Sequence, residues 1–502
     1  MLRAVKEMAL RQQLQGGSTI TQQLVKSALL SPERTIQRKI REVFLAFLVE
    51  KKYSKNQILE LYLNQVPYGG TSYGAASASH LFFGKSVRQI SLAEAALLSG
   101  MPQAPTAYSP FGAHPELARQ RQEQVLKRML EDKHITKEQY EQALNEPLIY
   151  SPPSHKILAP HFSLYVRDQL VKKYSEDMVL RGGLKVTTTL DYELQKFAEQ
   201  IFASESAALL KLKASNAAAV VTKPGTGEVL AMLGSIDYFA TPSGNFNVTL
   251  AKRQPGSAFK PINYAVGLDS KKVTPATLFV DGPICYPSLT GQKNYCPQNY
   301  DGRWHGPVQL RFALGNSFNI PAVKMMKFNG VETVIATASA MGISTLTEKN
   351  RYGLSLTLGG GEVTMLDMAV AFGTFANAGA RQDLITIAKV EDRFGKVLFV
   401  APSFPSFPSS PSSPFRSSLL ISGPRVISPE AAYLISHILL DNNARAATFG
   451  EQSYLRIKNH QAVSVKTGTT DDKRDNWTIG YTPSYLTAVW VGNNDNSPMS
   501  PY

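Results

Sequence analysis

Three short segments in the second half of the chain carry side chains suited to nucleophilic catalysis. The segment "SAFK" places Ser257 and Lys260 three residues apart, directly after a Pro-Gly pair. At a helix start this spacing puts both side chains on one face, and a desolvated lysine can take the proton of a serine hydroxyl. Two further segments follow, "SFN" (Ser317, Asn319) and "KTGT" (from Lys466). Each is common by chance, so the prediction of a serine nucleophile depends on the order and context of all three.

The order of these motifs resembles the signature of penicillin-binding proteins and serine β-lactamases. The segments around them widen the likeness: "QPGSAFKP", "NYDGRWHGPVQLRFALGNSFNIPAVK" and "VKTGTTDDKRDNWTIGYTPSYLTAVWVG" are similar to the transpeptidase domain of class A penicillin-binding proteins. The resemblance implies that Ser257 attacks the penultimate D-alanine carbonyl of a stem peptide, and that Lys260 takes the proton. Transpeptidation of this kind requires no cofactor.

The same resemblance implies roles for the other motif residues. Ser317 would relay a proton towards the leaving D-alanine, and Asn319 would hold the substrate amide. Lys466 would lend positive charge, and the segment Thr467, Gly468 and Thr469 would meet the substrate carboxylate. The oxyanion would lie between the backbone N–H groups of Ser257 and Thr469.

The N-terminal region carries a second resemblance. "GGSTITQQLVK", within the hydroxyl- and amide-rich stretch that starts at Gln13, is similar to the second motif of family-51 glycosyltransferases. "RKIREVFLAFLVEKKYSKNQILELYLNQV" is similar to the third motif, and "GAASASHLFFGK" and "SLAEAALLSGMPQAPTAYSP" to the fourth and fifth. Such domains join lipid-linked disaccharide-peptides into glycan strands, and form the usual N-terminal half of class A penicillin-binding proteins. The resemblance therefore implies a bifunctional peptidoglycan synthase.

By this resemblance Glu42 is the second catalytic carboxylate, near the donor pyrophosphate or its metal, and a divalent cation (Mg or Mn) is a candidate cofactor. Basic residues suited to phosphate would neutralise its charge, namely Lys26, Arg34, Arg38 and Lys39. Three polar residues would line the sugar site, namely Ser18, Gln22 and Gln23. The alternative for Glu42 is an i,i+4 ion pair with Arg38 on a solvated helix face.

One part of the glycosyltransferase pattern is absent from the sequence. The family's first motif is a Glu-Asp pair followed by Phe and His-x-Gly, and it supplies the general base. Glu7 is the only acid before Gly16 and lacks that context. No apolar run approaches 18 residues, so no anchor helix is expected, and the end at "NSPMSPY" is short. We therefore expect a chain truncated at both ends, with little polymerase activity.

Net charge narrows the class of partner. The chain has 502 residues and a formal charge of +14, with basic runs before residue 175. Anionic membrane surfaces and substrates with pyrophosphate or carboxylates fit this charge. Nucleic acid is not expected, because no zinc-ligand spacing or aromatic-interleaved basic strand is present. The resemblance implies lipid II and nascent peptidoglycan as partners, β-lactams as inhibitors, and a place at the extracytoplasmic face of the bacterial cytoplasmic membrane.

Cys285 and Cys296 are the only cysteines. They flank "YPSLTGQKNY", a turn-like loop, so that a disulfide-closed hairpin is geometrically reasonable. Two unrelated free thiols are the alternative, and a bridge would indicate an oxidising compartment.

These residues need elements to position them. Residues 1–150 have helical periodicity, for example the apolar positions between Thr35 and Lys52, and are expected to form a lysozyme-like, mostly α domain. Residues 151–215 are expected to form a linker or connecting subdomain between the two domains. Residues 216–502 alternate strands and helices, which indicates an α/β or α+β domain with a central antiparallel sheet. Within them, residues 402–418 form a Pro/Ser-rich insert with a proline at every third position, typical of an exposed spacer.

Two other functions stay open from the sequence. A D,D-carboxypeptidase or β-lactamase would share the serine and lysine, but a β-lactamase also needs a glutamate for deacylation, and Glu362 in "GGGEVT" has the wrong context. A non-catalytic cell-wall binding module is the third hypothesis. The intact nucleophile, base and KTG segment argue against it.

Overall fold

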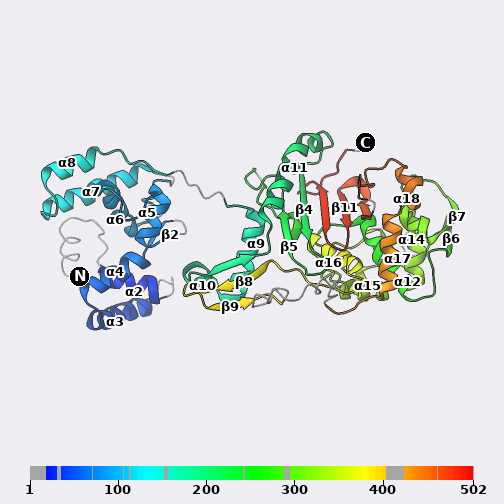
Figure 1. Cartoon of the computed structure of the whole chain (residues 1–502), viewed down its shortest axis with the longest axis horizontal. Helices are drawn as coiled ribbons and strands as arrows, with labels where there is room; N and C mark the ends of the chain where they lie inside the picture. The colour runs from blue at the N-terminus through cyan, green and yellow to red at the C-terminus, as the bar shows by residue number, and fades with distance from the viewer. Residues whose placement is uncertain are drawn as a thin grey trace, which may run out of the picture. The chain divides into compact units, whose positions relative to one another are not determined.

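The chain folds into two compact units, Met1–Lys156 and Ile157–Tyr502 (Figure 1). The computed structural model describes residues 18–30, 36–69, 72–105, 107–111, 115–151, 157–240, 243–287, 294–402, 423–460 and 462–500. Glu7, the stretch from Gln13 to Gly17, Arg34, and the Pro/Ser-rich insert beyond Pro402 lie outside the described residues.

The first unit is mostly helical, as expected. Its elements in chain order are α2 (Ile20–Leu29), α3 (Ile36–Lys52), α4 (Lys55–Gln65), β1 (Pro67–Gly69), β2 (Ser72–Tyr73), α5 (Ala75–Phe83), α6 (Leu92–Gly100), η1 (Met101–Gln103), α7 (Pro115–Glu131) and α8 (Lys137–Asn145). The two short strands pair antiparallel. Nowhere in the described parts of the chain is a helix both long and apolar enough to span a bilayer.

Local sequence explains where these helices begin. Four of them start with a capping box, in which the cap hydroxyl accepts from the third helical N–H while that residue's side chain accepts from the cap N–H. The pairs are Thr19 with Gln22, Ser54 with Gln57, Ser91 with Glu94, and Thr136 with Gln139. In α6, Glu94 also accepts from Lys85 Nζ at 2.7 Å. This buried carboxylate therefore joins the cap to the loop before the helix.

A five-stranded antiparallel sheet forms the centre of the second unit, which confirms the expected fold class. Its order is β10 (Ser464–Thr469), β11 (Asp475–Tyr481), β12 (Leu486–Gly492), β4 (Asn216–Thr222) and β5 (Val229–Leu233). The first strand of this order, β10, carries the KTG segment. Because β10 is an edge strand of the described sheet, one of its sides is open to the rest of the site.

Helices cover both faces of this sheet (Figure 1). Along β4, alternate side chains point to opposite faces, so Val221 packs with α11 (Tyr192–Lys211) while Val220 joins the main core. The main core lies under α12 (Lys260–Asp269), α16 (Met365–Ala376) and α17 (Pro429–Leu440). The fully buried Trp477 and Trp490 belong to it.

The remaining elements of the second unit surround this centre. They are α9 (Pro160–Tyr174), α10 (Glu176–Arg181), β3 (Lys185–Thr188), η2 (Val248–Leu250), η3 (Gly256–Phe259), β6 (Leu278–Asp281), β7 (Gly306–Gln309), α13 (Leu310–Gly315), α14 (Asn319–Asn329), α15 (Val331–Ala340), η4 (Lys349–Arg351), η5 (Leu354–Leu358), β8 (Ile387–Glu391), β9 (Val397–Val400), α18 (Asn442–Phe449) and η6 (Asp471–Lys473). Strand β3 pairs with β8. Residues 157–215, expected to connect, are thus packed within the second unit.

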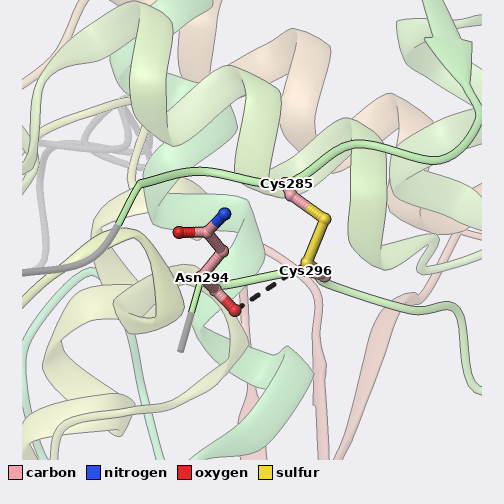
Figure 2. Close-up of a disulfide and its surroundings, with 3 residues drawn as sticks. All are labelled: Cys285, Asn294 and Cys296. Carbon is pink, nitrogen blue, oxygen red and sulfur yellow. Dashed lines mark hydrogen bonds between the residues drawn. A yellow bond between two sulfur atoms is a disulfide. The ribbon is translucent and has the colours of Figure 1, made fainter. Parts of the chain in front are cut away.

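The loop between β6 and β7 carries the two cysteines. They form a disulfide, with Cα atoms 4.2 Å apart (Figure 2). The sulfur of Cys296 lies 3.8 Å from the carbonyl oxygen of Asn294, a contact in which the bonded sulfur has no proton to donate. An antiparallel bridge between Tyr286 and Tyr295 continues the hairpin. The disulfide and the bridge together tie down the two arms of this loop.

Candidate active site

Ser257 lies on a tight turn at the start of α12. The turn is the 3₁₀ segment η3, and Ser257 is partly exposed while Lys260 is fully buried. The residue before the serine, Gly256, has φ +54°, a conformation that favours glycine. Upstream, the carbonyl of Gln254 accepts a hydrogen bond at 2.9 Å from the indole N–H of Trp477. The central sheet thus holds the entry to this turn.

Glycines let the serine turn pass between two other segments. A Cβ on Gly468 of β10 would lie 2.2 Å from the carbonyl oxygen of Pro255. A Cβ on Gly256 would lie 2.5 Å from the carbonyl oxygen of Thr469, and one on Gly359, just after η5, would lie 2.2 Å from the Gly256 nitrogen. The KTG strand therefore runs in direct contact with the backbone beside Ser257.

The second and third motifs meet the first through two lysines. Lys260 Nζ donates to the Ser317 carbonyl oxygen and, at 2.7 Å, to Asn319 Oδ1. Its contact with Ser317 Oγ is longer, 3.4 Å. Lys466 Nζ donates to Ser317 Oγ at 2.8 Å and to the Thr467 carbonyl oxygen at 2.7 Å. The Ser317 hydroxyl therefore lies between the two amines, and the Ser257 hydroxyl is not among the acceptors of Lys260.

The backbone presents Ser317 in an uncommon conformation. Its φ is +63°, in the left-handed region where glycine is usual. Helix α13 ends there in a Schellman motif, with Ser317 N donating to Leu314 O and Phe318 N donating to Ala313 O. A serine in the position that favours glycine costs about 1 kcal/mol or more. This backbone conformation places the Ser317 hydroxyl between Lys260 and Lys466.

Burial alters the protonation of both lysines. The pKa of Lys260 lies well below its usual value, first because the side chain is buried and second because Lys466 is nearby. The pKa of Lys466 is lowered to about 7, again by burial first and then by the positive charge of Arg445. A neutral lysine can accept a proton, so the site holds a base at neutral pH.

The low pKa of Lys466 predicts a pH-dependent stability. The unfolded chain holds the lysine proton up to about pH 10.5, whereas the folded chain releases it near pH 7. Between these values the unfolded state binds more protons, so stability rises with pH by up to about 1.4 kcal/mol per pH unit for one such group. Below about pH 7 this contribution to stability is absent and no longer changes.

We expect Lys466→Met to reduce the slope of unfolding free energy against pH between pH 7 and 9. All three tryptophans lie in the second unit, so their fluorescence in urea titrations follows the relevant transition. The matched control is the exposed Lys396, changed to methionine. An unchanged slope in Lys466→Met would contradict the shifted pKa.

A second group of polar residues, not assigned a role from the sequence, supports Asn319. Asn299 Oδ1 accepts from the backbone N–H of Asn319 at 2.8 Å, and its Nδ2 donates to Asp281 Oδ2 at 2.8 Å. His305 Nδ1 lies 2.6 Å from the same Asp281 oxygen, and the His305 ring stacks on Phe318 at 4.0 Å between centroids. Asn299 and His305 lie in the segment "NYDGRWHGP", whose likeness to the family was the only available signal, whereas Asp281 is the last residue of β6 and had none.

Comparison with known proteins decides the family. The model of the transglycosylase family matches residues 1–130, and that of the penicillin-binding protein transpeptidase domain matches residues 217–500. Penicillin-binding protein 1A of Aquifex aeolicus is 32% identical over 561 residues, which cover 95% of this chain and 73% of that protein. The chain belongs to the class A penicillin-binding proteins. It carries the two domains of a bifunctional peptidoglycan synthase, a transglycosylase and a transpeptidase.

Other relatives agree with this placement. Penicillin-binding protein 1A of Clostridium botulinum is 33% identical over 97% of this chain, which spans 60% of that protein. Among solved structures, penicillin-binding protein 1A from Haemophilus influenzae has a TM-score of 0.69 and 25% identity, covering 95% of this chain and 83% of that one. PonA1 from Mycobacterium tuberculosis shares the fold, with a TM-score of 0.54 over 68% of this chain and 84% of that one, at 24% identity.

The clearance at Gly468 predicts a costly substitution in this penicillin-binding protein. We expect Gly468→Ala to destabilise the second unit by about 1–3 kcal/mol, because the new methyl group meets backbone rather than a flexible side chain, and to slow penicillin acylation at least tenfold. Fluorescent penicillin labelling and urea unfolding measure both effects. Gly353→Ala is the control, since a Cβ there meets nothing within 4 Å. Equal behaviour of the two variants would refute the close approach.

In the glycosyltransferase unit the structure brings four of the predicted residues together. Glu42 is 1% exposed, and its carboxylate accepts from Arg38 at 3.2 Å and from Lys39. Lys39 Nζ also donates to Ser18 Oγ at 3.1 Å. The i,i+4 pair with Arg38 thus exists, but the Glu42 carboxylate is buried, while Arg38 and Lys39 keep part of their surface exposed.

The remaining sugar and phosphate candidates have other surroundings. Gln22 is buried, and its side-chain oxygen caps α2 by accepting from Thr19 N at 3.1 Å. Gln23 Oε1 accepts from the Tyr62 hydroxyl at 3.2 Å. Lys26 is exposed. Arg34 lies outside the described residues.

The surroundings of Glu42 do not fit a divalent cation among the described residues. No group of three or more His, Cys, Asp or Glu side chains that could hold a metal ion occurs in the part of the chain that the structure describes. Both oxygens of Glu42 are engaged by cationic side chains, Arg38 and Lys39. A hard cation takes several oxygen ligands, and Glu42 alone, already paired with two cationic side chains, does not supply them.

Proposed function

We propose that Ser257 is the nucleophile of a D,D-transpeptidase that cross-links stem peptides through an acyl-enzyme. The observation that carries this assignment is the position of the Ser317 hydroxyl between the amines of Lys260 and Lys466. Lys260 is the first residue of α12 and directly follows the turn that holds Ser257. The buried amine of Lys260 can then take the proton of the nucleophile. The Ser317 hydroxyl connects this amine to that of Lys466. The arrangement supplies a base, a proton relay and a charge within one site.

The proton can be followed through each step of acylation. The neutral amine of Lys260 takes the proton of Ser257 as Oγ bonds to the penultimate D-alanine carbonyl carbon. The C–N bond to the terminal D-alanine then breaks, and its nitrogen receives a proton through the Ser317 hydroxyl. Deacylation reverses this order, with the amine of a second stem peptide as the attacking group. No oxidant, reductant or cofactor is required.

Substrate contacts follow from the strand beside the serine. Thr469 lies against Gly256, which supports an oxyanion site made by the backbone N–H groups of Ser257 and Thr469. Lys466, Thr467 and Thr469 would hold the terminal carboxylate, with Gly468 giving the strand its close approach. Asn319, held by Asn299, would orient the substrate amide.

A hydrolytic function is the alternative, and the experiment is product analysis. Glu362, the nearest candidate for a deacylating glutamate, is paired with Arg351 at 3.1 Å. We expect a stem-pentapeptide donor and an amine acceptor to yield the cross-linked dimer by mass spectrometry. We also expect chromogenic cephalosporin to acylate the chain without sustained turnover. Continuous cephalosporin hydrolysis, with no dimer formed, would assign a β-lactamase instead.

The first unit supports a proposal on substrate and location. Its family suggests lipid II as the glycosyl donor and glycan strands as the product, and Arg38 and Lys39 around Glu42 suit a pyrophosphate. Helix α3 exposes apolar side chains beside basic ones, namely Ile36, Ile40, Val43, Phe44, Phe47 and Leu48. Such a face fits the interface of an anionic bilayer, which is consistent with the extracytoplasmic surface of the cytoplasmic membrane.

This membrane contact gives a direct prediction. We expect the Phe44→Ser, Phe47→Ser double variant to reduce co-flotation with anionic phosphatidylglycerol vesicles at least threefold, because two exposed rings of α3 are lost. The control is Phe394→Ser, an exposed ring in the second unit. Equal flotation of both variants would contradict a role for α3.

A further inference from the structure

Arg445, on α18, is a buried cation with an unfilled hydrogen-bonding capacity. The residue is 4% exposed, and its Nε has no hydrogen-bond partner. The nearby Asp441 is already used: its Oδ2 accepts from Arg311 at 2.8 Å, and its Oδ1 accepts from the backbone of Asn443. Buried polar groups are normally paired, so the unpaired Nε of Arg445 indicates a missing partner.

A cavity of about 320 Å³ opens beside this arginine. Asn442 lines it as well, and its Oδ1 is a second buried atom with no hydrogen-bond partner, while its Nδ2 donates to the Glu451 carbonyl at 3.0 Å. The rest of the polar wall consists of Asp441, Asn443, Arg456 and His460. The apolar part consists of Leu440, Leu455, Ile457 and Val463. The volume falls within the range of small-molecule sites.

We propose that this cavity binds a small carboxylate that also carries an N–H donor, such as an amino acid derivative or the carboxyl end of a peptide. The forked guanidinium of Arg445 matches a carboxylate, and Arg456 adds positive charge. Asn442 Oδ1 matches an N–H group on the same ligand. The carboxylate of Asp441 in the wall disfavours a doubly charged phosphate.

The cavity is close to the transpeptidase site. A smaller void shares Arg445 and Leu455 with the cavity, and it is also lined by Lys466 and Thr467 of the transpeptidase site. Asn316, the residue before Ser317, is bonded to the same helix, since its Nδ2 donates to Ala444 O and its Oδ1 accepts from Thr448 N, both at 2.9 Å. An occupant of the cavity therefore contacts the helix that holds Ser317 in place.

The test uses the full chain after acylation by penicillin, so that the transpeptidase site is blocked. Three probes are titrated by calorimetry: N-acetylglycine, N-acetylsarcosine (no N–H) and N-acetylglycinamide (no carboxylate). We expect N-acetylglycine to bind, N-acetylsarcosine to bind at least fivefold more weakly, and N-acetylglycinamide not to bind. Equal binding of the first two would overturn the role of Asn442, and absence of binding by all three would overturn the site.

Two variants test whether the heat of N-acetylglycine binding measured by calorimetry comes from this cavity. Arg445→Met is expected to weaken N-acetylglycine at least tenfold, whereas the exposed Arg393→Met should match wild type. If Arg445→Met does not fold, Asn442→Asp places a carboxylate beside the arginine and should also abolish binding. Retained binding in either folded variant would overturn the proposal. If penicillin fails to acylate the chain, the proposed nucleophile fails, while the contrast between the Arg445 and Arg393 variants still decides the binding site.

Discussion

Replacing Ser257 with alanine is expected to abolish covalent labelling of the chain by penicillin. The serine is the partly exposed residue of a turn held by Gln254 and flanked by β10, one helical turn before the buried base Lys260. Removing its oxygen removes the atom that bonds to the β-lactam carbonyl. We expect the acylation rate to fall by at least about 10⁴-fold, as for other catalytic serines.

Intact-mass analysis and peptide mapping after incubation with penicillin measure this effect. The control is Ser204→Ala, an exposed serine on α11, which should label like the wild type. Urea unfolding followed by tryptophan fluorescence shows whether Ser257→Ala is folded. A folded Ser257→Ala that still gains the penicilloyl mass would refute the assignment, and a label on Ser317 would transfer the role of nucleophile to that residue.

Elements with strong local signals were predictable from the sequence. Ser54 and Ser91 each stand three residues before a Gln or Glu, the pattern of a capping box, and both form one. A cap depends on residues three positions apart, so its signal is complete within a short segment. The signal of a strand is likewise contained in a short apolar segment. "AAAVVT" and "YLTAVWVG" form the paired strands β4 and β12.

Burial was less predictable, because it depends on residues far along the chain. The periodicity of α3 is correct, but Phe44 and Phe47 are more than half exposed. Glu42 has the local pattern of a solvated ion pair and is nevertheless buried. An amphipathic pattern tells which residues share a face, and not what covers that face.

The supporting polar residues had no distinctive signal. Asp281, Asn299 and His305 occur in segments rich in turn-forming residues, where such side chains commonly cap turns. Arg445 follows an Asn-Asn-Ala stretch typical of an exposed helix start. Only the tertiary structure shows that Asp281 and Arg445 are buried, and that Asn299 holds Asn319.

Replacing Lys260 with methionine is expected to slow penicillin acylation by about 10³-fold while the chain stays folded. Lys260 is fully buried, and this burial and the nearby Lys466 hold its pKa well below the usual value, which favours the neutral amine. A neutral amine has two N–H bonds, and its two shortest contacts, with Ser317 O and Asn319 Oδ1, use both. The lone pair then remains for the proton of Ser257. Methionine keeps the length and apolar packing of the side chain but has no such lone pair.

The comparison with Lys260→Arg separates base from charge. Arginine keeps a cation and hydrogen-bond donors but does not lose its proton in proteins, so we expect it to be as slow as methionine. Stopped-flow acylation with a fluorescent penicillin gives the rates, and circular dichroism confirms the fold of each variant. If Lys260→Arg acylated within tenfold of the wild type, the positive charge would be the contribution of residue 260, and the proton of Ser257 would have to leave through Ser317 to Lys466.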